Sequence, residues 1–84
     1  MDHSTYFHII KSNTVHLQEI AHHIKERRKA LGISQEDLAS LSGVSLRTLK
    51  TIESGKSNPT LQTLYDLVNV LGMEIKLGVK QLNS

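Results

Sequence analysis

Between residues 45 and 54 the chain carries polar side chains that can recognise nucleic-acid bases. At about 100° per residue, Arg47, Lys50 and Thr51 project from one side of a helix, while Leu49 and Ile52 project from the other. An arginine can donate to guanine O6 and N7, a threonine can offer its hydroxyl to a base or its methyl group to thymine, and a lysine suits phosphate. This spacing predicts a face that reads DNA.

The same charges would also suit an ordinary solvated helix face, so the flanking residues decide between the two interpretations. Ser34 and Ser45 can each cap a short amphipathic helix, and the two helices are joined by only Ser42, Gly43 and Val44. So short a connection requires a sharp corner between helices. This is the geometry of a helix-turn-helix, in which the second helix enters a DNA groove.

Residues around the second helix complete the predicted interface. Gln35 is the first residue inside the first helix of the pair, where unpaired backbone N–H groups attract phosphate, although it also suits ordinary solvent exposure. Leu46 either touches a thymine methyl group or packs inward. Thr48 lies at the flank, and a polar loop follows Gly55. The predicted DNA-binding residues are Gln35, Ser45, Leu46, Arg47, Thr48, Lys50, Thr51, Lys56, Ser57 and Asn58.

Four helices are expected to position this face. Apolar residues at helical spacing predict helices over about 15–31, 34–41, 45–54 and 60–71, with glycine 32, 55 and 72 as stop signals. Asp37 should form a capping box with Ser34, and Val44 should pack on Leu49 as a hydrophobic staple. In the last helix the residues expected to face inward are Leu61, Leu64, Leu67, Val68 and Leu71, and Tyr65 or Leu67 could line a dimer contact.

After Gly72 the pattern changes to a period of two, which predicts a strand. A single strand needs a partner, either the Tyr6–Ile10 segment or the same strand of a second chain, and the second is favoured because dimers read palindromic sites. Antiparallel pairing centred on Ile75 sets Glu74 opposite Lys76. The predicted dimerisation residues are Met73, Glu74, Ile75, Lys76, Leu77 and Val79.

Composition limits the other functions. The 84 residues suit one domain with a modest aliphatic core, since the hydrophobic share is 38% with no Trp and one Phe. With no Cys, disulfides and thiolate metal sites are excluded. No apolar run suits a membrane span or a signal peptide, so we expect a cytoplasmic protein. The net charge of +2 permits nucleic acid but is weak evidence for it.

Catalysis and metal binding find no support in the sequence. The serines lack a plausible base and orienting acid, and no glycine-rich phosphate loop or paired carboxylates occur. The five histidines (3, 8, 16, 22 and 23) include no two that are four residues apart, so none stack on adjacent helical turns as a metal pair. We therefore expect a protein that is not an enzyme and carries no metal or cofactor.

Residues 21–71 resemble the phage-repressor-like (Xre/Cro) helix-turn-helix family. The resemblance rests on Arg28 with Leu31-Gly32, Ser34-Gln35, Leu38-Ala39, Gly43-Val44-Ser45, Ile52-Glu53 with Gly55, and Pro59 with Leu64. It implies a structural ion pair between Arg28 and Glu53, which displaces the alternative that Glu53 rejects a base.

The C-terminal strand pattern is similar to that of HipB-type antitoxins, whose strands pair across a dimer. This resemblance implies a HipA-type serine/threonine kinase toxin as partner and repression of the shared operon. The alternatives are a phage-type or stand-alone regulator without a toxin, and a module that mainly binds a toxin.

The expected architecture is mostly α, a four- to five-helix phage-repressor-like domain with a short C-terminal β-strand paired across a homodimer. An arm or short strand is expected over residues 1–14, the DNA-binding domain over 15–72, the dimerisation strand over 73–80 and a tail over 81–84. The expected partners are double-stranded DNA with a palindromic operator and a second copy of the chain.

Overall fold

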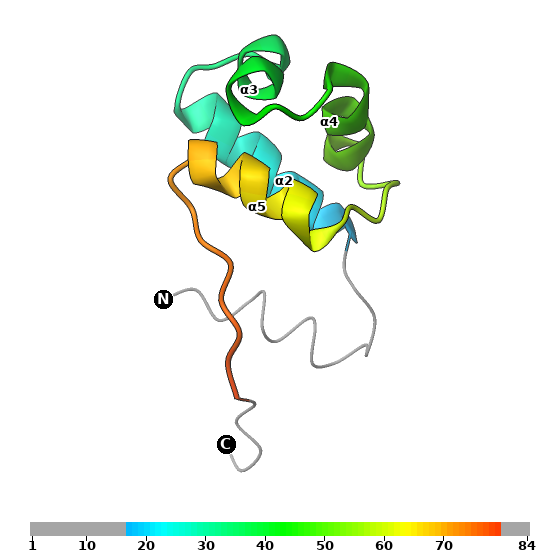
Figure 1. The fold of residues 1–84 in the computed structure, drawn as a ribbon, viewed down its shortest axis with the longest axis vertical. Coiled ribbons are helices and arrows are strands. Elements are labelled where there is room, and N and C mark those ends of the chain that lie inside the picture. The colour runs from blue at the N-terminus through cyan, green and yellow to red at the C-terminus, as the bar shows by residue number, and fades with distance from the viewer. Residues whose placement is uncertain (1–16, 80–84) are drawn as a thin grey trace.

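The computed structural model describes residues 17–79, which form four helices and contain no strand. The helices are α2 (Leu17–Ala30), α3 (Gln35–Ser42), α4 (Leu46–Glu53) and α5 (Leu61–Val70). In Figure 1, α2 and α5 lie together below the shorter α3 and α4. The predicted mostly helical fold is confirmed over these residues, whereas the predicted arm, including Tyr6–Ile10, lies outside them.

The predicted caps set where three of the helices begin. Ser34 Oγ accepts the backbone N–H of Asp37 at 2.9 Å, and Asp37 Oδ2 accepts the backbone N–H of Ser34 at 3.1 Å, which is the predicted capping box. The hydrogen bond from the Ser34 backbone N–H, with a smaller effect of the Ser34 side chain, lowers the pKa of the Asp37 carboxyl group. Ser45 and Thr60 cap α4 and α5 in the same way, each accepting at 3.1 Å from the N–H three residues ahead.

A close approach between α2 and the end of α4 requires glycine at position 55. Gly55 has a φ of +77°, in the left-handed region, and a Cβ there would lie 2.8 Å from Gln18 Cγ and 3.2 Å from Gln18 Cα. Because the second atom belongs to the backbone of α2, a larger residue could not be accommodated by a side-chain movement alone. Gly55 therefore lets α4 end directly against the first turn of α2.

One aliphatic core holds the helices in place. α3 packs against both α4 and α5, and α2 packs against α4. Val44 and Leu49, the predicted hydrophobic staple, are both buried in this core. The largest fully buried side chains come from all four helices and from the residue after α5: Ile24, Leu38, Leu49, Ile52, Leu67 and Leu71.

Two predictions for α5 need correction. Leu61 was expected to face inward but is 69% exposed, because it is the first residue of the helix and lies beyond the apolar stripe formed by the later turns. Leu67 is completely buried, so it cannot line a dimer contact. Tyr65 is 53% exposed and lies one turn after Leu61, on the same side of the helix. An exposed apolar face therefore remains on α5.

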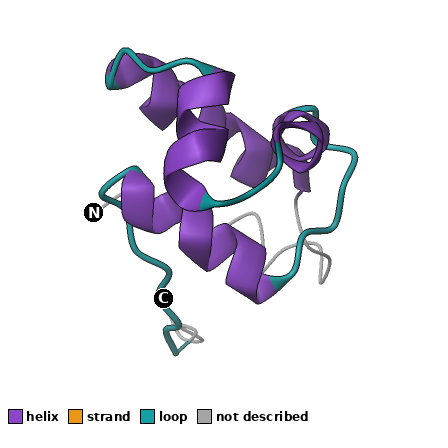
Figure 2. Ribbon diagram, turned by 45° about the horizontal axis from the view of Figure 1, so that its top comes forward, coloured by secondary structure: helices purple, strands orange, loops and turns teal. Residues whose placement is uncertain are grey.

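The predicted C-terminal strand is not formed within the described single chain. Residues 73–79 leave α5 as a segment without regular secondary structure (Figures 1 and 2). The physical reason is that a strand needs a second edge to satisfy its backbone groups, and no described residue provides one. The segment starts at a fixed place, because Arg27 Nε donates to the Leu71 carbonyl oxygen at 2.8 Å and so ties the end of α5 to α2.

Candidate nucleic-acid interface

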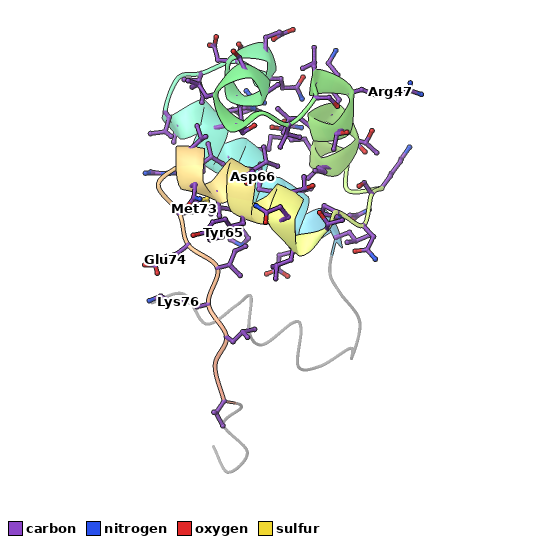
Figure 3. The ribbon with its side chains drawn as sticks, in the orientation of Figure 1. Arg47, Tyr65, Asp66, Met73, Glu74 and Lys76 are labelled. Carbon is purple, nitrogen blue, oxygen red and sulfur yellow. The ribbon has the colours of Figure 1, made fainter. Side chains whose placement is uncertain are left out.

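The outer face of α4 consists of polar side chains. Arg47, Lys50 and Thr51 are exposed, whereas Leu49 and Ile52 on the opposite face are buried. Figure 3 shows the Arg47 side chain extending away from the body of the domain. The buried face fixes the rotation of the helix about its axis, so the same three polar residues always point outward.

Two hydroxyl protons on this face are used within the helix itself. Thr51 Oγ1 donates to the Arg47 carbonyl oxygen at 2.9 Å, and Ser54 Oγ donates to the Thr51 carbonyl oxygen at 2.6 Å. Since the Thr51 hydroxyl has one proton, this residue offers a base its methyl group and an oxygen lone pair, but no donor. The sequence alone could not show that the Thr51 hydroxyl proton is already bonded within the helix.

At the N-terminal end of α4, the hydroxyl groups of Ser45 and Thr48 have different roles. Ser45 Oγ accepts the Thr48 N–H and donates to Thr48 Oγ1 at 2.9 Å. The Ser45 hydroxyl proton is therefore bonded within the cap, while the Thr48 hydroxyl retains its proton for another acceptor. Leu46 is half-buried and packs against the core, as one of its two predicted roles requires.

Glu53 forms the ion pair that the family resemblance implied. Arg28 Nε donates to Glu53 Oε2 at 2.8 Å and Arg28 Nη2 donates to Glu53 Oε1 at 3.0 Å, in a two-pronged contact. The hydrogen bonds to Glu53 raise the pKa of Arg28, despite the opposing effect of burial. Arg28 Nη1 also donates to the Ile33 carbonyl oxygen at 3.0 Å. Glu53 is thus a structural anchor for the end of α4.

The Gln35 side chain makes a hydrogen bond that neither sequence-based interpretation predicted. Its side chain is half-buried, and Nε2 donates to Glu53 Oε1 at 3.0 Å. The first residue of α3 is therefore linked to the last residue of α4. The sequence offered no signal for this bond, because it depends on how closely the two helix ends approach each other.

The loop after α4 extends the polar surface. Lys56 and Asn58 are exposed and Ser57 is half-buried. Together with α4 they contribute three cationic side chains, and the one acidic residue between them, Glu53, is paired with Arg28. The surface formed by α4 and the loop after it is therefore basic, which suits the phosphate backbone.

Within residues 17–79, no three His, Asp or Glu side chains come close enough to hold a metal ion. His3, His8 and His16 lie outside this range. The described helices are all too short or too polar to traverse a lipid bilayer.

Comparison with known proteins agrees with this geometry. A family model described as helix-turn-helix matches residues 24–77. An uncharacterized HTH-type transcriptional regulator of Sinorhizobium fredii is 41% identical over 46 residues, which cover 55% of this chain and 60% of that protein. A similarly named protein of Haemophilus influenzae is 44% identical over 50 residues, or 60% of this chain and 51% of that protein.

The match with a third relative covers a larger share of that protein. The HTH-type transcriptional regulator of Methanothermobacter thermautotrophicus is 39% identical over 51 residues, which cover 61% of this chain and 74% of that protein. This chain thus spans only about half to three-fifths of the first two relatives. The family match covers the second half of α2 and all of α3, α4 and α5.

Proposed function

This chain belongs to the helix-turn-helix family of DNA-binding transcriptional regulators, and on that premise we propose that it is a homodimeric repressor of a palindromic operator. The observation that carries the proposal is the two-sided character of α4. Its inner face is buried and its end is held by the Arg28–Glu53 pair. Its outer face presents Arg47, Lys50 and Thr51 to a groove.

Each part of this surface has a distinct role in the proposal. Arg47 lies in the first turn of α4, where it reaches base edges and can donate twice to guanine. Lys50 at the side of the helix and Lys56 in the following loop bind phosphates, with Ser57 and Asn58 as further donors. Phosphate binding releases counterions, so affinity should fall steeply as the salt concentration rises.

The proposed homodimer uses residues 73–79 as its pairing strands. Leu77 and Val79 are 99% and 94% exposed, which leaves apolar surface for a partner. Glu74 Oε2 and Lys76 Nζ are 4.0 Å apart and lie on the same side of the segment (Figure 3). In an antiparallel pair centred on Ile75, each Glu74 would face Lys76 of the second copy. The dimer would place two α4 helices about 34 Å apart, in successive major grooves.

A second proposal concerns the biological partner. The apolar C-terminal segment after a helix-turn-helix domain favours an antitoxin of the HipB type, which would neutralise a HipA-type kinase and repress the shared operon. The alternatives are a regulator without a toxin and a module that mainly binds a toxin. A kinase-like open reading frame beside this gene, whose product co-purifies with this protein, would support the antitoxin. A neighbourhood of integrase or lysogeny genes would contradict it.

A mobility-shift titration with the DNA upstream of its own gene tests the repressor. We expect retardation at low salt, which should weaken as salt is added. Unlabelled upstream DNA should compete for binding better than unrelated DNA does. Absence of retardation by folded dimer would contradict the proposal. Truncation after Gly72 tests the dimer separately by sedimentation, since persistent dimers would exclude pairing through residues 73–79.

A further inference from the structure

Two consecutive arginines of α2 reach two different parts of the domain. Arg28 donates to the Glu53 carboxylate at the end of α4, whereas Arg27 Nε donates to the carbonyl oxygen of Leu71, directly after α5, at 2.8 Å. Successive side chains of a helix project about 100° apart, so a single turn of α2 contacts both places. α2 therefore connects the end of the recognition helix with the start of residues 73–79.

The chain leaves α5 through a tight turn with its own hydrogen bonds. Gly72 has a φ of +69°, and its N–H donates to the Asn69 carbonyl oxygen at 3.3 Å, while the Met73 N–H donates to the Val68 carbonyl oxygen at 2.9 Å. These two bonds form a Schellman motif, which ends the helix and fixes the path of the backbone through the turn. Because neither bond uses the carbonyl oxygen of Leu71, that oxygen is available to α2.

Arg27 and the core hold this turn, and the segment beyond it is exposed. A Cβ on Gly72 would lie 3.5 Å from Arg27 Nη2, so the guanidinium group lies along the turn. Met73 is half-buried against the core. From Glu74 to residue 79 the described residues are all exposed, and their one ion pair, Glu74–Lys76, lies within the segment. Within the described residues, the contacts that orient the segment relative to the helices therefore end at Met73.

A small change of angle at this turn has a large effect in the proposed dimer. The two α4 helices would lie about 34 Å apart, so each would be roughly 17 Å from the two-fold axis. A tilt of about 10° between the domain and its pairing strand would move α4 by roughly 3 Å, which is close to the ~3.4 Å rise of one base pair. The angle at which the segment leaves the domain thus determines which spacing of half-sites both helices can occupy.

We propose that Arg27 is a positioning residue that sets the half-site spacing of the dimer, because its hydrogen bond to Leu71 fixes the angle between the domain and the pairing strand. This inference rests on the proposed strand-paired homodimer. In this role Arg27 touches neither DNA nor the second copy. Loss of the bond should therefore leave dimer association and the affinity for one half-site unchanged, and should weaken the preference for one spacing.

Two neutral substitutions of similar length separate the hydrogen bond from the charge. In Arg27→Gln the amide nitrogen takes the place of Nε along the side chain and retains an N–H donor, whereas Arg27→Met places a methyl group there. Arg27→Gln should therefore behave as the wild type does, and Arg27→Met should not. Lys29→Met removes a charge from the same exposed turn of α2 and should also behave as the wild type does.

The first measurement needs no DNA. The chain has no cysteine, so Ser40→Cys, at an exposed position of α3, provides one spin-label site in each protomer. Double electron–electron resonance then gives the distances between the two labels. We expect a narrow distribution in the wild-type, Arg27→Gln and Lys29→Met backgrounds, and one that is broadened or displaced by roughly 3 Å in Arg27→Met. The same distribution in Arg27→Met as in the wild type, or a changed one in Arg27→Gln, would overturn the proposal.

The second measurement uses the palindrome that the wild-type protein enriches from a random DNA library. The affinity for this palindrome is divided by that for versions with one base pair added or removed at the centre. In Arg27→Met this ratio should fall about fivefold, the effect of one hydrogen bond, and an unchanged ratio would overturn the proposal. Unfolding curves set a temperature at which all variants are folded.

Sedimentation of the wild type distinguishes failure of this role from failure of the proposed dimer. A monomer, or a dimer that survives truncation after Gly72, removes the proposed strand pairing and the role of Arg27 with it. A strand-paired wild-type dimer whose spacing preference does not depend on Arg27 removes only the positioning role.

Discussion

Arg28 Nε and Glu53 Oε2 are 2.8 Å apart although the two residues are separated by 25 positions in the chain. Their side chains are 11% and 2% exposed. The pair joins the last turn of α2 to the last residue of α4. It therefore anchors the end of the recognition helix to α2.

Breaking one side of this pair should be more harmful than removing both. Arg28→Met leaves the Glu53 carboxylate buried without its cation, and the free energy of unfolding should fall by about 3–5 kcal/mol. Arg28→Met/Glu53→Met replaces both charges with apolar groups and should recover most of that loss. Urea unfolding measures both values. Equal destabilisation by the single and double changes would contradict this account.

Arg47 and Lys50 should have different effects on DNA binding. Arg47→Ala should weaken binding to the operator by about 1–3 kcal/mol and affect unrelated DNA much less. Lys50→Ala should weaken binding to all sequences equally and reduce the salt slope by about one. Lys29→Ala, at an exposed basic position on α2, is the control. Equal losses for Arg47→Ala on both kinds of DNA would instead identify a phosphate contact.

Thr51 is expected to contribute its methyl group, because its hydroxyl proton is bonded to the Arg47 carbonyl oxygen. Valine has the same shape and retains a methyl group, so Thr51→Val should preserve operator affinity. Thr51→Ser should reduce it by roughly fourfold, the effect of one buried methyl group. Replacing thymines of the operator one by one with uracil checks the assignment. The sensitive thymine should no longer matter to Thr51→Ser, and its continued effect would exclude this contact.

The proposed strand pairing makes a charge-swap prediction. Glu74→Lys would place lysine opposite lysine across the dimer and should raise the dimer dissociation constant, since like charges directly opposite destabilise a strand pair. Glu74→Lys/Lys76→Glu restores opposite charges and should restore dimerisation. Sedimentation equilibrium measures both variants. Unchanged association of the single variant would place the dimer contact elsewhere, with the Leu61–Tyr65 face of α5 as the next surface to test.

Asp37 should make the free energy of unfolding depend on pH under acidic conditions. Its pKa is lowered in the folded protein by the Ser34 hydrogen bonds, so the unfolded state binds protons more readily. Its stabilising contribution is therefore complete above its ordinary pKa of 3.8 and is lost as the pH falls through the lower folded value. The difference in unfolding free energy between the wild type and Asp37→Asn should shrink over this interval. Ser34→Ala, which removes the hydroxyl partner, should reduce the difference at neutral pH.

Local features of this protein could be predicted from the sequence because their causes lie within a few residues. The caps at Ser34, Ser45 and Thr60 bond to the residue three positions ahead, and Gly55 ends α4 with its own backbone angle. The outward face of α4 follows from helical spacing alone. The Arg28–Glu53 pair was expected only through the family resemblance.

Other features depended on the arrangement of the helices in space. The residue pattern was compatible with Gln35 as a phosphate ligand or as a solvent-exposed side chain. It could not predict the hydrogen bond from the Gln35 amide to Glu53, which depends on the approach of α3 and α4. The apolar pattern of α5 included Leu61, but the limits of its packing against α3 left that residue exposed.

The sequence by itself therefore determined four helices, three of them with predicted caps, and the polar face of α4, since these features depend on short-range spacing. Only the tertiary structure decided how that face is held, because the buried carboxylate of Glu53 collects donors from two other helices. The same distinction applies to residues 73–79, whose alternating pattern is local but whose strand requires an edge that these helices do not supply.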